Sequence, residues 1–127
     1  MELKETESAV FLCRLEGDGI CRTIVKPDAE ILLSHAIENT ENVSRLFSGV
    51  PGPLFVDLRK IKSMSKEARD HFSMRGRTAK VNAIGLLIKS PVSRVIGNFY
   101  MLFSKPSTPT KLFTEEKNAI AWLKQFV

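Results

Sequence analysis

Two short, almost uninterrupted apolar runs, at residues 54–58 and 81–88, constrain the fold more than any other feature of this sequence. Each run is too apolar for an edge strand and too short for a helix, which is typical of a central parallel strand. Parallel neighbours need a crossover connection, and a stretch with helical apolar spacing follows each run. The sequence therefore predicts an α/β fold in which helices flank a largely parallel sheet.

The same alternation extends in both directions along the chain. The predicted segments are a hairpin of strands 9–16 and 20–25, helices that begin at Pro27, Ser65, Ser90 and Thr114, and a last strand at 110–113. The predicted order is β-β-α-β-α-β-α-β-α. This order gives one domain over residues 1–127, with a five-stranded mixed sheet flanked by helices.

The third predicted helix carries two different stripes at helical spacing. The apolar stripe, which we expect to face the core, contains Val92, Val95, Ile96, Phe99, Leu102 and Phe103. The opposite stripe contains Arg94, Asn98, Met101 and Lys105. Because Tyr100 and Met101 make its flank less polar than most solvated surfaces, Arg94 and Asn98 are candidates for a partner surface or a homodimer seam. Plain solvated surface is the alternative.

Charge is distributed unevenly along the chain. The net charge is +5, but residues 1–58 sum to −5 and residues 59–127 to +10. The basic excess is greatest at residues 59–80, where eight bases accompany two acids. Such a stretch can attract nucleic acid, anionic lipid or an acidic protein surface, or it can be a solvated face near the acidic first half. Interleaved aromatic residues are missing apart from Phe72, so the pattern does not favour nucleic-acid binding.

The N-terminal residues and the cysteines indicate a cytoplasmic protein. The first ten residues carry acids where a secretory signal carries bases, and no apolar run approaches the length of a membrane span. Thiols stay reduced in the cytoplasm, so Cys13 and Cys21 are interpreted as small strand hydrophobes. Their spacing about the predicted turn leaves open that they face each other across the hairpin.

No catalytic, cofactor or metal motif is evident in the sequence. Neither a dinucleotide-binding glycine pattern nor a phosphate-binding loop follows a predicted strand. His35 and His71 have no carboxylate or cysteine partners at metal-ligand spacing, and neither cysteine lies on a strand-to-helix elbow. Asp57 is expected to pair with Arg59 or with a helix amide. We therefore expect a protein that is not an enzyme and needs no cofactor.

Two predicted strand-to-helix junctions are candidates for binding. Parallel strands end at one edge of a sheet, where helix N-termini attract anions. The residues proposed to form an anion or partner site there are Arg59, Lys62, Ser65, Lys66, Ser90, Arg94 and Asn98. This site requires the segments that begin at Ser65 and Ser90 to emerge side by side. The alternative is that both serines only cap helices and that the basic side chains are solvated.

Parts of the sequence resemble the SpoIIAA-like group of small bacterial proteins, which is related to STAS domains and, more distantly, to CRAL-TRIO proteins. The resemblance covers most of the chain from Ala9 onward and points to an uncharacterised branch. It is carried by the strand end Phe55-Val56-Asp57-Leu58-Arg59, the segment from Ser90 to Phe99, and the tail from Lys111 to Leu123.

The resemblance also implies a second function. STAS antagonists of anti-sigma factors carry a phosphoacceptor serine at the start of the helix that follows the central strand. The matching stretch is Ser63-Met64-Ser65-Lys66-Glu67, which has serines but lacks the aspartate before the acceptor and the glycine after it. We thus expect a non-enzymatic module that binds a protein partner or a small anion. The alternative is a partner-switching protein phosphorylated on Ser65 or Ser63.

Overall fold

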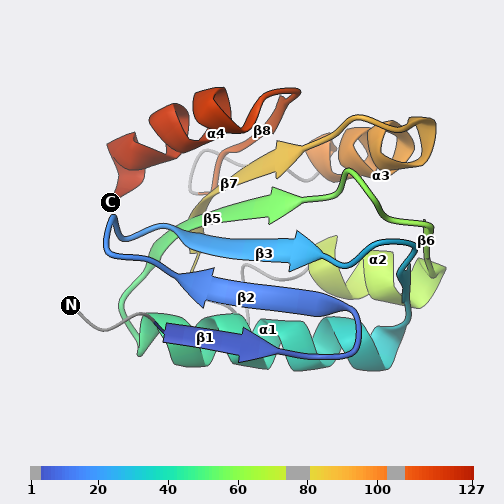
Figure 1. Ribbon diagram of the computed structural model, residues 1–127, viewed down its shortest axis with the longest axis horizontal. Helices are drawn as coiled ribbons and strands as arrows, with labels where there is room; N and C mark the ends of the chain where they lie inside the picture. The colour runs from blue at the N-terminus through green and yellow to red at the C-terminus, as the bar shows by residue number, and fades with distance from the viewer. Residues whose placement is uncertain (1–3, 74–80, 103–107) are drawn as a thin grey trace.

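The computed structural model describes residues 4–73, 81–102 and 108–127. Its centre is a six-stranded sheet in the order β1-β2-β3-β5-β7-β8 (Figure 1). These strands are β1 (Lys4–Glu7), β2 (Phe11–Leu15), β3 (Cys21–Val25), β5 (Gly52–Asp57), β7 (Val81–Leu87) and β8 (Thr110–Phe113). The pairs β1–β2 and β2–β3 are antiparallel, whereas β3, β5, β7 and β8 run parallel. The predicted mixed α/β architecture with a buried parallel centre is confirmed.

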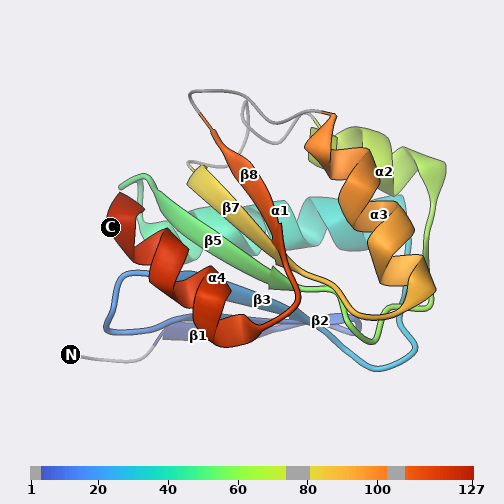
Figure 2. The same cartoon turned by 90° about the horizontal axis from the view of Figure 1, so that it is seen from above.

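Helices cover both faces of this sheet (Figure 2). One face carries α1 (Leu33–Phe47), α2 (Lys66–Ser73) and α3 (Pro91–Met101). The other carries α4 (Glu116–Leu123), which continues into the short 3-10 turn η2 (Lys124–Phe126). Residues alternate between the two faces along each strand, so β5 contributes Leu54 and Val56 to the larger core and Phe55 to the smaller one.

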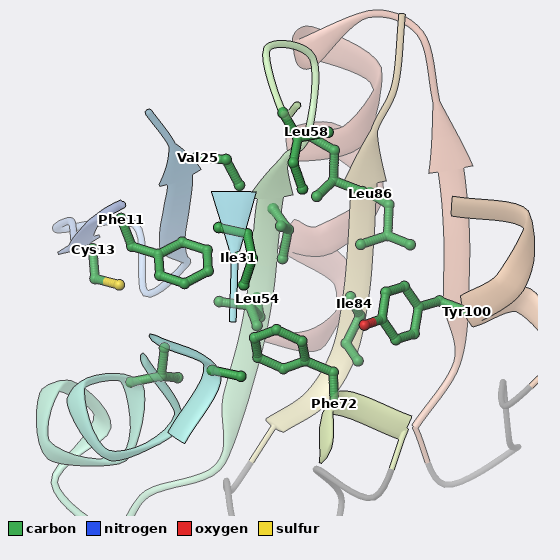
Figure 3. Packing of buried hydrophobic residues seen from close by; sticks show 14 of the residues in the cluster. Phe11, Cys13, Val25, Ile31, Leu54, Leu58, Phe72, Ile84, Leu86 and Tyr100 are labelled. Carbon is green, nitrogen blue, oxygen red and sulfur yellow. The ribbon is translucent and has the colours of Figure 1, made fainter. Parts of the chain in front are cut away.

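The larger core lies between the sheet and α1–α3 (Figure 3). Phe72 of α2 and Tyr100 of α3 point toward one another there, and their ring centroids are 6.3 Å apart. Phe72 also contacts Phe11 of β2 at 6.4 Å. Aromatic contacts of this edge-on kind link the two helices to the sheet.

A small second sheet distinguishes the observed fold from the predicted one. β4 (Glu30–Ile31) pairs in parallel with β6 (Ser63–Met64). The first helix consequently begins at Leu33, and the prediction that it begins at Pro27 is wrong. The backbone turns at Asp28, whose φ is +59° and whose N–H donates to the carbonyl of Lys60 at 2.9 Å. This long-range bond has no local sequence signal.

Two further boundaries differ from the prediction. The sheet has six strands and not five, because β1 adds an antiparallel edge to the predicted hairpin. The N-cap of α4 is Glu115, so the prediction that Thr114 caps this helix is wrong. The side of α4 that packs on the sheet carries Ala119 and Leu123, which are fully buried in the smaller core.

The largest difference concerns the orientation of α3. Three residues predicted to face the core are exposed: Val92 by 41%, Val95 by 65% and Leu102 by 78%. The buried residues are Ser93, Ile96, Gly97 and Tyr100, so the predicted stripe is wrong for every described member except Ile96 and the half-buried Phe99. Phe103 and Lys105 lie outside the described residues.

Gly97 explains this orientation. A Cβ atom placed at Gly97 would lie 3.0 Å from side-chain carbons of Ile88 and of Leu112. The helix backbone therefore packs closely against the sheet at this glycine. Ser93, also fully buried, accepts from the Lys89 amide at 2.8 Å and donates to the Ser90 carbonyl at 2.8 Å. Close packing of small residues thus turns the larger aliphatic side chains outward.

None of the helices in the described ranges is long and apolar enough to cross a membrane.

Candidate functional site

The first predicted junction forms a compact turn that leads into α2. The Ser65 hydroxyl accepts from the Ala68 amide at 3.1 Å, which makes Ser65 the cap of the helix. The Ser65 amide donates to the carbonyl of Ile31 at 2.9 Å, so the small β4–β6 sheet holds the turn in place. Ser63 lies in β6 with an exposed side chain, and Ser65 is half-buried.

The lysines of this junction differ in their pairing. Lys66 contacts Asp70 of the next helical turn at 3.2 Å. Lys62 is exposed, and its amide donates to the carbonyl of Ala29 at 2.9 Å. The structure therefore brings Lys62, Ser63, Ser65 and Lys66 together at one surface.

The second junction starts α3. The Ser90 hydroxyl accepts from the Ser93 amide at 3.1 Å, and Pro91 occupies the first helical turn. The predicted capping role of Ser90 is confirmed. Arg94 and Asn98 follow on the exposed surface of the same helix.

Arg59 does not join either junction. Its partner Asp57 follows Phe55 by two residues, so the Asp57 side chain points to the α4 side of the sheet. Arg59 Nε and Nη2 donate to the two Asp57 carboxylate oxygens at 3.0 and 2.8 Å. This hydrogen-bonded pairing with Asp57 raises the pKa of the Arg59 guanidinium, and Glu116 of α4 adds to the shift. The cation is thus already neutralised on the face opposite α2 and α3.

The two capping serines lie at the same end of the molecule, but among the described residues neither serine forms a hydrogen bond with the other. Both α2 and α3 begin near the carboxyl ends of β5 and β7 (Figure 2). The residue beside Ser65, Met64, accepts a hydrogen bond from the hydroxyl of Tyr100 at 3.1 Å. Tyr100 is ten residues beyond Ser90, about 15 Å along the helix at 1.5 Å per residue. The turn before α2 therefore lies beside the second half of α3.

The outward stripe of α3 is a surface that its apolar spacing predicts to lie in the core. Val92, Val95 and Leu102 are exposed, and the half-buried Phe99 continues their helical spacing at the margin of the exposed side. We call these four residues the α3 stripe. The guanidinium of Arg69 from α2 lies 5.3 Å from the centroid of the Phe99 ring, a cation–π distance. The small residues Ser93 and Gly97, spaced by four, were the signal that could have identified the buried side.

The cysteines are separate free thiols inside the larger core. Cys13 pairs in register with Thr23 and not with Cys21, so the two do not face each other across the hairpin. Burial raises the pKa of both thiols, that of Cys21 to about 12. Cys13 Sγ donates to Asn39 Oδ1 at 2.8 Å. These interactions keep both thiols protonated and structural.

The histidines have local structural partners. The Leu32 amide donates to His35 Nδ1 at 3.0 Å at the start of α1. The hydroxyl of Thr40 and His71 Nε2 are 2.8 Å apart and link α1 to α2. Within residues 4–73, 81–102 and 108–127, no three His, Cys, Asp or Glu side chains form a group that could hold a metal ion.

Comparison with solved structures identifies the fold. An uncharacterized protein from the DUF3478 family of Shewanella loihica PV-4, described as having a SpoIIAA-like fold, matches with a TM-score of 0.63 at 12% identity. The match covers 96% of this chain and 92% of that one. An anti-sigma factor antagonist from Mycobacterium paratuberculosis matches with a TM-score of 0.62 at 13% identity, over 97% and 95% of the two chains. The fold is therefore SpoIIAA-like, as the sequence resemblance implied.

A protein with unknown function from Arthrobacter sp. FB24 is 31% identical, over 87% of this chain and 90% of that one, with a TM-score of 0.35. No functionally curated protein matches the sequence. A family model described as "Domain of unknown function (DUF7793)" matches residues 13–127. The chain belongs to this DUF7793 family.

Proposed function

We propose that this protein is a non-enzymatic regulatory module that acts by binding a protein partner on the α3 stripe. The observation that carries the proposal is the outward orientation of Val92, Val95 and Leu102. Ser93, Ile96, Gly97 and Tyr100 pack this helix against the core, so the three exposed aliphatic side chains contribute little to that packing. Exposed apolar patches with a polar border are typical of protein interaction sites.

Polar and basic side chains border the stripe. Arg94 and Asn98 lie on α3 itself, and Lys89 precedes it, all three exposed. Within the described part of the chain, Arg94 and Lys89 form no ion pair and are available to an acidic partner. This combination of an apolar centre and a charged border is the usual anatomy of a protein interface.

A protein surface fits the arrangement better than a small anion does. An anion would need several free cations at one point, whereas Arg59 is bound to Asp57 on the other face and Lys66 contacts Asp70. The fold agrees with this choice. One structural neighbour is described as an anti-sigma factor antagonist, a name that refers to action on another protein.

Site-specific photo-crosslinking in the native host tests this proposal. A photoreactive residue at position 95 should give a defined adduct with a protein that mass spectrometry identifies, and Arg94→Glu should reduce its yield. The matched control places the same residue at Lys117, on α4 at the other face, where the side chain is 82% exposed. Identical adducts from both positions, or none from position 95, would contradict the proposal.

Phosphorylation of Ser65 or Ser63 is a second candidate function. Ser63 is exposed and Ser65 caps α2, so a phosphate on either side chain would lie near Lys62, Lys66 and the positive end of the helix. Intact-mass analysis of the protein from its host should then show a gain of one phosphate that is lost in the matching serine-to-alanine variant. Unmodified protein under several growth conditions would argue against this function.

A further inference from the structure

We propose that the partner on the α3 stripe is a second copy of this chain, which docks through the first two turns of its α1. This inference rests on the proposed function, because it assumes that the α3 stripe is a binding surface. The second copy is inferred from the apolar and charged side chains that this chain exposes at the start of α1.

The start of α1 exposes a second apolar patch. Leu32 is 54% exposed, Leu33 39% and Ile37 41%. Leu33 and Ile37 are spaced by four and therefore lie on one side of the helix. Exposed aliphatic residues thus occur together at two places on the helical face, at the start of α1 and along α3.

Acidic side chains border the α1 patch. Glu38 and Glu41 are exposed on the same helix, and Glu30 is exposed just before it. No ion pair involves these three glutamates among the residues that the structure describes. Several other carboxylates are paired within the chain, such as Glu7 with Lys26 at 2.5 Å. The α1 patch therefore presents free negative charge around an apolar centre.

The two patches are complementary. The α3 stripe has free positive charge at Arg94 and Lys89, and Arg94 is the only charged residue within α3. An α1 patch on an α3 stripe would bury aliphatic side chains at the centre and place glutamates beside Arg94. Two α3 stripes facing each other would instead bring together two surfaces whose charged border residues, Arg94 and Lys89, are all basic. Charge therefore selects the α1-to-α3 arrangement.

The fold allows this arrangement between two copies and not within one. The two helices cover the same face of the sheet (Figure 2), but α2 lies between them (Figure 1). It contacts α1 through His71 and Thr40, and it contacts α3 through Phe72 and Tyr100. A two-fold axis between copies would let each α1 meet the other's α3, which closes the assembly as a dimer.

Analytical ultracentrifugation of the purified full chain tests the proposal. The wild-type protein should sediment as a concentration-dependent dimer, and Val95→Asp should raise the dimer dissociation constant more than about tenfold. The matched control is Val50→Asp, because Val50 is 68% exposed but lies in the connection between α1 and β5. This variant should dimerise like the wild type. A wild-type protein that is monomeric throughout the micromolar range would overturn the proposal.

Variants that reverse the charge of the α3 stripe or of the α1 patch test whether these two surfaces contact each other. Arg94→Glu alone and the double variant Glu38→Arg/Glu41→Arg alone should each be largely monomeric. An equimolar mixture should form a dimer, because each α1 then meets an α3 of opposite charge. A dimer that neither variant weakens, or a mixture that stays monomeric, would overturn the proposal. Circular dichroism checks that each variant is folded.

Ultracentrifugation and crosslinking together distinguish failure of the second-copy proposal from failure of the proposed function. If the purified chain is monomeric while position 95 still crosslinks a different protein in the host, the second-copy proposal fails and the α3 stripe remains a binding site. If the chain is monomeric and position 95 gives no adduct, both proposals fail.

Discussion

Asp57 illustrates how much of this molecule is decided at single residues. A carboxylate at the end of a buried strand needs a partner, and the sequence predicts either Arg59 or a helix amide in that role. The structure shows the pair, with the Asp57 side chain only 12% exposed. We expect Arg59→Met to lower the free energy of unfolding by about 1–3 kcal/mol, because it leaves a largely buried carboxylate short of donors.

Urea unfolding measures this loss. The matched control is Lys62→Met, an exposed lysine that forms no ion pair with a described residue, and it should change stability by less than about 0.5 kcal/mol. Equal stability of the two variants would show that the Arg59–Asp57 pair has no structural role.

The buried thiols give a second prediction at the residue scale. Burial raises the pKa of Cys21 from its ordinary value of 9.0 to about 12, and that of Cys13 in the same direction. The thiols should therefore stay unreactive toward a disulfide reagent at pH 8 in the folded protein. In urea, two thiols per chain should react. Fast reaction of the folded protein would contradict the burial of both residues.

The same pKa shift predicts a change of stability with pH. A thiol whose pKa is raised by folding stabilises the folded state below its unfolded pKa of about 9 and loses that contribution as the pH rises toward 12. Substitution of Cys21 by alanine should make the free energy of unfolding fall less between pH 8 and pH 10. An unchanged pH dependence would contradict the assignment.

Some residue roles could be predicted and others could not. The capping serines and the Asp57–Arg59 pair follow from chemistry that is local in the chain. Ser93 was not predicted, because its burial depends on how closely α3 approaches the sheet. The sequence also did not predict that Cys13 lies opposite Thr23, because this pairing depends on the register of the hairpin.

At the scale of one element, α3 shows why apolar spacing alone did not give the buried side. The helix has a stripe of large aliphatic residues and a stripe that combines Ser93, Ile96, Gly97 and Tyr100. Hydrophobicity favours burial of the first stripe. Packing favours the second, because only small residues allow the helix backbone to lie against Ile88 and Leu112. The distance between the α3 backbone and the sheet cannot be predicted from the apolar spacing of the sequence.

Substitution of Gly97 tests this explanation. Gly97→Val places a Cβ atom 3.0 Å from carbons of Ile88 and Leu112, so overpacking should lower the free energy of unfolding by about 1–3 kcal/mol. The matched control is Asn98→Val, at the next, exposed position of the same helix. Thermal or urea unfolding compares the two. A control that is destabilised as much as Gly97→Val would contradict close packing at Gly97.

At the scale of the whole molecule, the sequence predicts the layers better than their edges. The parallel centre follows from its apolar runs, and α4 follows from its spacing. β1 was not predicted because its four residues, KETE, carry no apolar alternation. Its register with β2 and the ion pairs of Glu5 with Arg14 and Glu7 with Lys26 are long-range interactions.

The candidate site, too, could be predicted only in part from the sequence. The sequence locates both strand-to-helix junctions, and the structure places them at one end of the molecule (Figure 2). Their separation along α3 and the position of Arg59 on the other face depend on tertiary geometry. The α3 stripe was identified as a periodic feature but assigned to the core.

The central claim is that α3 keeps Val95 in solvent for a partner while Ile96 supports the fold. Urea unfolding of Val95→Asp and Ile96→Asp tests it most directly, because the two residues are neighbours and differ mainly in burial, 65% against 5% exposed. At a protein concentration low enough for the wild type to be monomeric, we predict that Val95→Asp stays within about 0.5 kcal/mol of the wild type and that Ile96→Asp loses at least about 3 kcal/mol. A comparable loss in Val95→Asp would show that the stripe is part of the core and would contradict the account.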